Sequence, residues 1–328
     1  MLNPICVHRR SSVVKNVIDF QMRIGQFLPF VIVSDVETVN RCIERSLKMT
    51  YNAEINRQNP SMFVFLVDQS GSMQDFFGSS ETPRQKADVV ADSINRLLQN
   101  LTIRCAKPDV RDYYFISVIG YGNKVGPALG GILSGRDIVS ISEIANNPIR
   151  IEEKTKKIDD GAGGIVDQKI KMPIWFDSIA NGGTPMCEAM RLSQTILSTW
   201  IAQHPTAFPP IVINITDGES TDGDPSVMAD GIKGISSNDG NVLLFNIHIS
   251  SVQGVNKVEF PDSEITLPPD QYASLLFRIS SVLPEYMRNI AKQEEFSISE
   301  ASKGFIFNGD PVALVRFLDI GTRAANLR

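Results

Sequence analysis

The chain has 328 residues, which is enough for one large domain with additions or for two small domains. Its hydrophobic content of 42% and charged content of 21% are those of an ordinary globular protein, and its net charge of −5 argues against a general nucleic-acid-binding protein. No apolar run approaches the roughly 20 residues that cross a bilayer, and no signal peptide is recognisable. We therefore expect a cytoplasmic protein that binds neither nucleic acid nor a membrane.

Residues 1–58 differ in character from the rest of the chain. "FLPFVIVSD" is typical of a strand, and "VETVNRCIERSLKM" has apolar residues near helical spacing. "NAEINRQNP" then breaks the pattern. We expect residues 1–58 to form an N-terminal extension packed on a main domain that covers residues 59–328.

The main domain begins with "MFVFLVD", an apolar run typical of a strand that is covered on both faces. A helix is predicted from Pro83, with Thr82 as its N-cap, because proline suits the first helical position. "YYFISVIGYG" predicts the next strand. The stretch 123–181 is irregular and predicts an insertion with long loops.

The alternation of helix and strand patterns then resumes. Helices are predicted at "TPMCEAMRLSQTILSTWI" and "DPSVMADGIKGIS", and strands at "PIVINITDG" and "NVLLFNIHI". A second insertion is expected near 251–300, before a last strand, "GFIFNG", and a last helix. This order predicts an α/β fold with a doubly wound, mostly parallel central sheet flanked by helices. In such sheets ligands bind at the carboxyl ends of the strands.

Two of the buried strands end in an aspartate, Asp68 and Asp217, so both carboxylates should lie on one edge of the sheet. No Lys or Arg stands beside them in the sequence, and a buried pair of like charges is costly, which a divalent cation would relieve. Ser70, Ser72 and Thr184 lie on loops at the same edge. All five side chains are oxygen donors, which suit Mg²⁺, with Mn²⁺ and Ca²⁺ as alternatives, and disfavour zinc or copper.

These motifs resemble those of the von Willebrand factor A (VWA) domain family. "DQSGSM" is similar to its D-x-S-x-S motif, "GGT" to its threonine loop, and "TDG" to its distal aspartate motif, in the same order along the chain. Together they resemble the metal-ion-dependent adhesion site (MIDAS) of that family.

The resemblance implies a role for each matched residue. Ser70, Ser72 and Thr184 would coordinate Mg²⁺ through their hydroxyls, and Asp68 and Asp217 would lie next to the metal, often acting through water. A protein partner would supply an Asp or Glu to complete the metal shell. The predicted helix near Pro185 would also favour an incoming carboxylate with its N-terminus. The site residues taken over from the resemblance are therefore Asp68, Ser70, Ser72, Thr184 and Asp217.

The resemblance implies a metal-dependent protein-interaction module, such as a scaffold or adaptor, rather than an enzyme. The layout is similar to bacterial cytosolic VWA proteins, including the tellurite-resistance-associated members, and such proteins work beside kinases, phosphatases or AAA+ ATPases.

Other interpretations remain for the same residues. The serines and Thr184 could only cap turns, the motif could be intact without a metal, or the site could belong to a metal-dependent hydrolase or phosphatase with Glu219 or Asp222 as base. A dehalogenase-type phosphotransferase would need a second acid where Ser70 stands. We interpret the acidic loop of Glu219, Asp222 and Asp224 as solvated, and His248 as structural.

Overall fold

The computed structural model describes residues 51–77, 83–106, 108–159, 165–249 and 256–322. Most of the predicted N-terminal extension lies outside these ranges, so its packing stays a prediction. The last part of it is described, and Ile55 lies in the hydrophobic core of the main domain. No helix in the described part of the chain is long and apolar enough to cross a bilayer.

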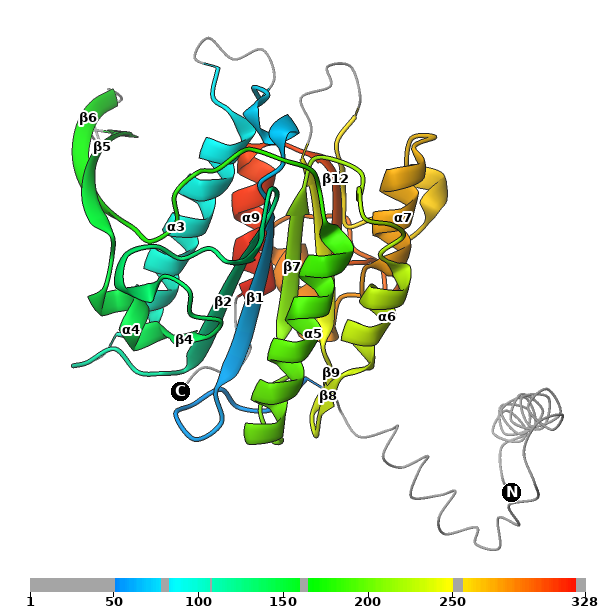
Figure 1. Ribbon diagram of the computed structural model, residues 1–328, viewed down its shortest axis with the longest axis horizontal. Coiled ribbons are helices and arrows are strands. Elements are labelled where there is room, and N and C mark those ends of the chain that lie inside the picture. The colour runs from blue at the N-terminus through cyan, green and yellow to red at the C-terminus, as the bar shows by residue number, and fades with distance from the viewer. Residues whose placement is uncertain (1–50, 78–82, 107, 160–164, 250–255, 323–328) are drawn as a thin grey trace, which may run out of the picture. The chain divides into compact units, whose positions relative to one another are not determined.

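An eight-stranded sheet runs through the domain in the order β11-β12-β10-β7-β1-β2-β3, with β4 beside β2 (Figure 1). The five inner strands are parallel, and the short strands at the edges are antiparallel. The inner strands are β12 (Phe305–Gly309), β10 (Leu243–Ile249), β7 (Ile211–Thr216), β1 (Ser61–Asp68) and β2 (Tyr114–Tyr121). The edge strands are β11 (Val258–Glu259), β3 (Val125–Pro127) and β4 (Val139–Ser140). The predicted fold class, a doubly wound α/β fold, is confirmed.

Helices cover both faces of this sheet (Figure 1). One face packs against α3 (Lys86–Cys105), α4 (Ile141–Asn146), α8 (Glu285–Gln293) and α9 (Pro311–Thr322). The other packs against α5 (Met186–Gln203), α6 (Ser226–Gly234) and α7 (Gln271–Ile279). In the described ranges, three short 3-10 helices lie in the loops: η1 (Gly71–Gln74), η2 (Gly131–Leu133) and η3 (Glu264–Thr266).

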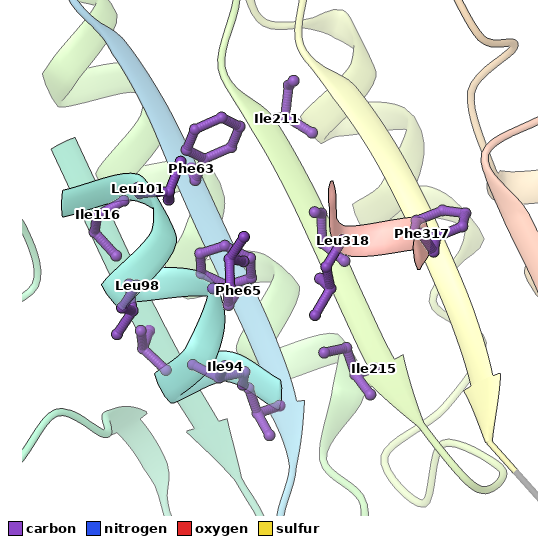
Figure 2. Close-up of a cluster of buried hydrophobic side chains, with 14 of the residues drawn as sticks. Phe63, Phe65, Ile94, Leu98, Leu101, Ile116, Ile211, Ile215, Phe317 and Leu318 are labelled. Atoms are coloured by element: carbon purple, nitrogen blue, oxygen red, sulfur yellow. The ribbon is translucent and has the colours of Figure 1, made fainter. Parts of the chain in front are cut away.

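Alternating side chains of β1 fill the two halves of the core. Phe63 and Phe65 point toward α3 and α9, where Figure 2 shows them among Ile94, Leu98 and Leu318. The residues between them, such as Val64, belong to the core under α5. A strand buried on both faces must be apolar throughout, which explains the unbroken run in the sequence before its aspartate.

The two stretches expected as insertions contain helices and strands of their own. The first includes β3, β4, α4 and a long antiparallel hairpin of β5 (Arg150–Asp159) and β6 (Ile165–Ile174). The second includes β11, η3, α7 and α8 in its described part. A smaller hairpin of β8 (Ser236–Ser237) and β9 (Gly240–Asn241) follows α6.

The predicted start of the first helix was wrong. Pro83 is not helical, and α3 begins at Lys86; Thr82 lies outside the described residues. The reason is a tertiary contact that local propensity does not reveal. The residues before the helix are extended against an earlier segment, because the Phe77 amide donates to the Arg84 carbonyl at 2.9 Å and the Lys86 amide to the Asp75 carbonyl at 2.9 Å.

A buried asparagine on α3 holds the end of the hairpin against the domain. The Asn95 side chain donates to the Phe176 carbonyl at 2.7 Å and accepts from the amides of Trp175 at 2.8 Å and Phe176 at 3.1 Å. Asn95 is 1% exposed, so these backbone groups have no water to bond to instead. One side chain thus satisfies three backbone groups where β6 ends.

Replacing Asn95 with alanine removes all three of these bonds. We expect the free energy of unfolding to fall by about 3 kcal/mol, because buried backbone groups lose their partners. Urea denaturation measures this. Asn100→Ala, at an exposed position of the same helix, is the matched control and should change stability by less than about 0.5 kcal/mol. A loss below about 1 kcal/mol for Asn95→Ala would show that other contacts hold this strand end.

Candidate metal centre

The predicted site residues lie where the strand order of the sheet reverses. The chain passes from β1 to β2 on one side, and later returns to the other side of β1 with β7. In doubly wound sheets this switch point leaves a crevice at the carboxyl ends of the strands, which is where ligands bind. Asp68 is the last residue of β1, and Asp217 follows the last residue of β7.

Both carboxylate oxygens of Asp68 are in use. One accepts from the Ser70 amide at 2.8 Å, and the other from the Thr216 hydroxyl at 2.7 Å. Asp68 is 1% exposed. Burial raises its pKa to about 6, and the nearby Asp217 charge acts in the same direction, against the lowering effect of the hydrogen bonds from Ser70 and Thr216. Without a cation, the folded protein therefore stabilises the charged form of Asp68 less well than water does.

The two serine hydroxyls lie together at the carboxyl end of β1. The oxygens of Ser70 and Ser72 are 3.0 Å apart, and the Ser72 hydroxyl donates to the Asp217 carboxylate at 2.7 Å. Neighbouring oxygen ligands of an octahedral Mg²⁺ ion, each about 2.1 Å from it, lie about 3.0 Å from one another. The spacing of the serine pair and the hard oxygen donors therefore fit a magnesium ion.

Backbone hydrogen bonds fasten the Thr184 loop beside the serine loop. The Gly71 amide donates to the Gly182 carbonyl at 3.0 Å, and the Asn181 amide donates to the Gln69 carbonyl at 2.7 Å. Gly182 has φ +81°, and a Cβ there would lie 2.5 Å from the Asn123 amide nitrogen, so only glycine fits. Thr184 itself is 6% exposed. The three motifs thus meet at one edge of the sheet.

Lys86 is a charged residue of this region that the sequence analysis missed. Its ammonium group donates to the Asp217 carboxylate at 2.8 Å, on the oxygen that Ser72 does not use. The two side chains are 6% and 0% exposed. No Lys or Arg is adjacent to either aspartate in the sequence, but the fold brings Lys86 to Asp217 across 131 positions of the chain.

The acidic loop after β7 is bonded rather than only solvated. Asp222 accepts from the amides of Cys187 at 3.0 Å and Glu188 at 2.9 Å, in the first turn of α5. The Glu219 carboxylate accepts from the Tyr272 hydroxyl, and Asp224 accepts from an amide at the start of α6. The α5 N-terminus therefore already has a carboxylate of this chain, which corrects the expectation that it would favour an incoming one.

His248 is built into the sheet near the same edge. Its ring stacks on Phe307 with centroids 4.9 Å apart, and its Nδ1 accepts from the Asn308 amide at 3.4 Å. Burial lowers the pKa of His248 to about 4, so the ring is neutral at physiological pH. These contacts fit a structural histidine.

The donor set has an unusual composition for a metal site. Among the described residues, no group of three or more His, Cys, Asp or Glu side chains could hold a metal ion. The candidate site has only two carboxylates, and its other three donors are hydroxyls. Such a site depends on hydroxyl geometry more than on accumulated negative charge.

The likenesses of this chain to known proteins are weak. No family model matches the chain, and no curated protein matches it. Among solved structures, it is similar to the human COPII-coat protein Sec24c, with a TM-score of 0.27 and 9% identity over 58% of this chain and 26% of that one. It is also similar to an uncharacterized membrane spanning protein from Vibrio fischeri, with a TM-score of 0.22 and 13% identity over 61% and 75% of the two chains.

The chain thus spans about a quarter of the Sec24c chain, and both TM-scores are too low to carry an argument about function. The strand order fits a VWA-like or Rossmann-like fold. The resemblance to the VWA family therefore rests on the three motifs and their arrangement.

Replacing Asp68 with asparagine should stabilise the protein in the absence of divalent cations at pH 7.5. The pKa of Asp68 is raised to about 6, above its unfolded value of about 4. Its favourable contribution is therefore complete below about pH 4 and is lost as the pH rises through 6. Asparagine carries no charge; its oxygen can accept from the Ser70 amide, and its NH2 can donate to the Thr216 hydroxyl oxygen in the reverse direction, so we expect a gain of about 1–2 kcal/mol in the free energy of unfolding.

Urea denaturation in EDTA between pH 4 and 7.5 measures this gain. Asp270→Asn, which changes the N-cap of α7 to another good capping residue, should leave the pH profile unchanged. An Asp68→Asn variant that is less stable than the wild type at pH 7.5 would contradict the account, because the charge would then be stabilising.

Proposed function

We propose that this protein is a module that binds an acidic side chain of a partner protein through a divalent cation, with Mg²⁺ as the first candidate. One observation carries the proposal. The hydroxyls of Ser70 and Ser72 lie 3.0 Å apart beside the carboxylates of two neighbouring strands, at the switch point of a doubly wound sheet. Nothing in the hydrophobic core requires this arrangement of oxygens.

The residues of the site have different roles in this proposal. Ser70, Ser72 and Thr184 would hold the cation with their hydroxyl oxygens. Asp217 accepts a hydrogen bond from the Ser72 hydroxyl at 2.7 Å, so the 3.0 Å contact between the two serine oxygens uses the Ser70 proton, and one lone pair of Ser72 remains for a cation. Asp68 accepts from the Ser70 amide and so fixes the loop that carries both serines. The bound cation would supply the positive charge that attracts a carboxylate.

The site is exposed to solvent on the side of Ser72. Asp68 and Ser70 are buried, whereas Ser72 is exposed, as is Glu219 on the loop after β7. A partner would therefore approach over Ser72. Three neutral hydroxyls leave the cation short of negative charge, so an Asp or Glu is the group that best completes its shell.

The bonds of the acidic loop favour binding over hydrolysis. A hydrolase at this site would need a base near the hydroxyls, and the candidates were Glu219 and Asp222. Asp222 caps α5 with both oxygens, and Glu219 accepts from Tyr272. Asp222 is therefore held by the first amides of α5, and Glu219 is held toward Tyr272 on α7. A screen of phosphoester and peptide substrates with Mg²⁺ tests the hydrolase alternative, and turnover above background would support it.

The identity of the partner is a wider proposal that rests on the resemblance to bacterial cytosolic VWA proteins. It names kinases, phosphatases and AAA+ ATPases as candidates, and a cytoplasmic location. Fractionation of the native host and crosslinking of the protein in its cells test both.

Replacing Ser72 with alanine should weaken Mg²⁺ binding at least about tenfold, because one ligand and the bond to Asp217 are lost. Isothermal titration calorimetry with Mg²⁺ or Mn²⁺ measures the affinity, and a rise in melting temperature with Mg²⁺ that EDTA reverses gives a second readout.

Ser142→Ala is the matched control. Ser140 and Ser142 form another pair of hydroxyls 3.0 Å apart, at the start of α4, so this variant makes the same change in an equivalent pair that belongs to no motif of the site. It should bind Mg²⁺ like the wild type. A wild-type protein that binds no divalent cation would refute the proposed function.

A further inference from the structure

The Lys86 side chain is buried against the candidate site rather than extended into solvent. Its ammonium group lies 2.8 Å from one Asp217 oxygen and 3.7 Å from the exposed carboxylate of Asp75. Lysine is rarely this buried unless it is paired, and the pair here is with a carboxylate that has no exposed surface of its own. Lys86 is thus a fixed positive charge next to the place where a cation would bind.

The position of Lys86 in its helix opposes local preference. It is the first residue of α3, where the helix dipole and the unpaired amides disfavour a cation. Neither helix propensity nor capping explains a lysine there. Residues that break a local rule without local compensation are typical of functional sites, and here the compensating contact is with Asp217.

The Lys86 ammonium changes the net charge of the site. Among the buried groups, Asp68 and Asp217 with Lys86 carry one net negative charge, and a bound divalent cation would change this to one net positive charge; the Asp75 carboxylate near Lys86 is exposed, so water screens its charge. Without Lys86 the loaded site would be neutral. A fixed ammonium group therefore repels the incoming metal ion, and it adds to the attraction of the loaded site for an anion.

We propose that Lys86 tunes this site, weakening its hold on the divalent cation while strengthening the hold of the loaded site on an acidic group of the partner. The inference rests on the proposed function. It makes cation binding and partner binding depend on each other, because the partner carboxylate offsets the excess positive charge that Lys86 maintains. A site of this kind is filled most firmly when cation and acidic partner are present together.

The test uses Lys86→Met, which removes the charge, and Lys86→Gln, which can keep a hydrogen bond to Asp217 without the charge. Isothermal titration calorimetry with Mn²⁺ should show both variants binding the metal about tenfold more tightly than the wild type. At saturating Mg²⁺, both should bind a short capped peptide with one glutamate several-fold more weakly. Lys154→Met, which breaks the ion pair of Lys154 with Asp92 on α3, should match the wild type in both.

The outcomes separate this inference from the proposed function. Equal Mn²⁺ affinity in the wild type and both Lys86 variants would overturn the inference and leave the proposed function intact. No cation binding in any of them would overturn both. A melting temperature measured in EDTA gives a readout without metal: if Lys86 offsets the Asp68 and Asp217 charges, Lys86→Met should lower it, and added Mn²⁺ should raise it by more than in the wild type.

Discussion

Two buried carboxylates at the ends of neighbouring strands are the constraint on which the rest of this edge depends. The fold places Asp68 and Asp217 at the ends of neighbouring strands at the switch point, where apolar neighbours cannot offset their charges. Burial raises the pKa of Asp68, and the nearby Asp217 charge adds a smaller effect in the same direction, so the charged form of Asp68 has a cost at this edge. The surrounding residues offset this cost. The Ser70 amide donates to Asp68, and the Ser72 hydroxyl and the Lys86 ammonium donate to Asp217.

The scaffold around the site is correspondingly rigid. The serine loop and the Thr184 loop are tied by backbone hydrogen bonds, and Gly182 allows them to approach closely. Below them, a chain of buried polar groups crosses the sheet. The Tyr121 hydroxyl donates to Asn214 at 2.7 Å, and the Asn214 amide donates to Asn246 at 3.0 Å. Satisfied buried networks of this kind favour a single arrangement of the strands and hold the carboxylates in place.

The sequence predicted the parts of the site that follow from strand position. An apolar run that ends in Asp, twice, in an alternating α/β pattern is enough to place both aspartates at one edge, and the strand order confirms that fold. Lys86 was not predictable in the same way, because its contact spans 131 residues and its helix starts later than its local signals indicate. The capping of α5 by Asp222 was missed for the same reason, since the two segments are 35 residues apart. Local pattern fixes which residues can lie at an edge, whereas tertiary pairing decides their partners.

The central claim is that the oxygens of Ser70, Ser72 and Thr184 hold a divalent cation beside Asp68 and Asp217. The most direct measurement is the anomalous scattering of Mn²⁺ in crystals grown with the ion. We predict one strong anomalous peak at this edge of the sheet, bonded to the serine and threonine hydroxyls, with Lys86 still in contact with Asp217. A fully ordered site with no anomalous peak at saturating Mn²⁺, or a peak that lies elsewhere on the molecule, would contradict the account.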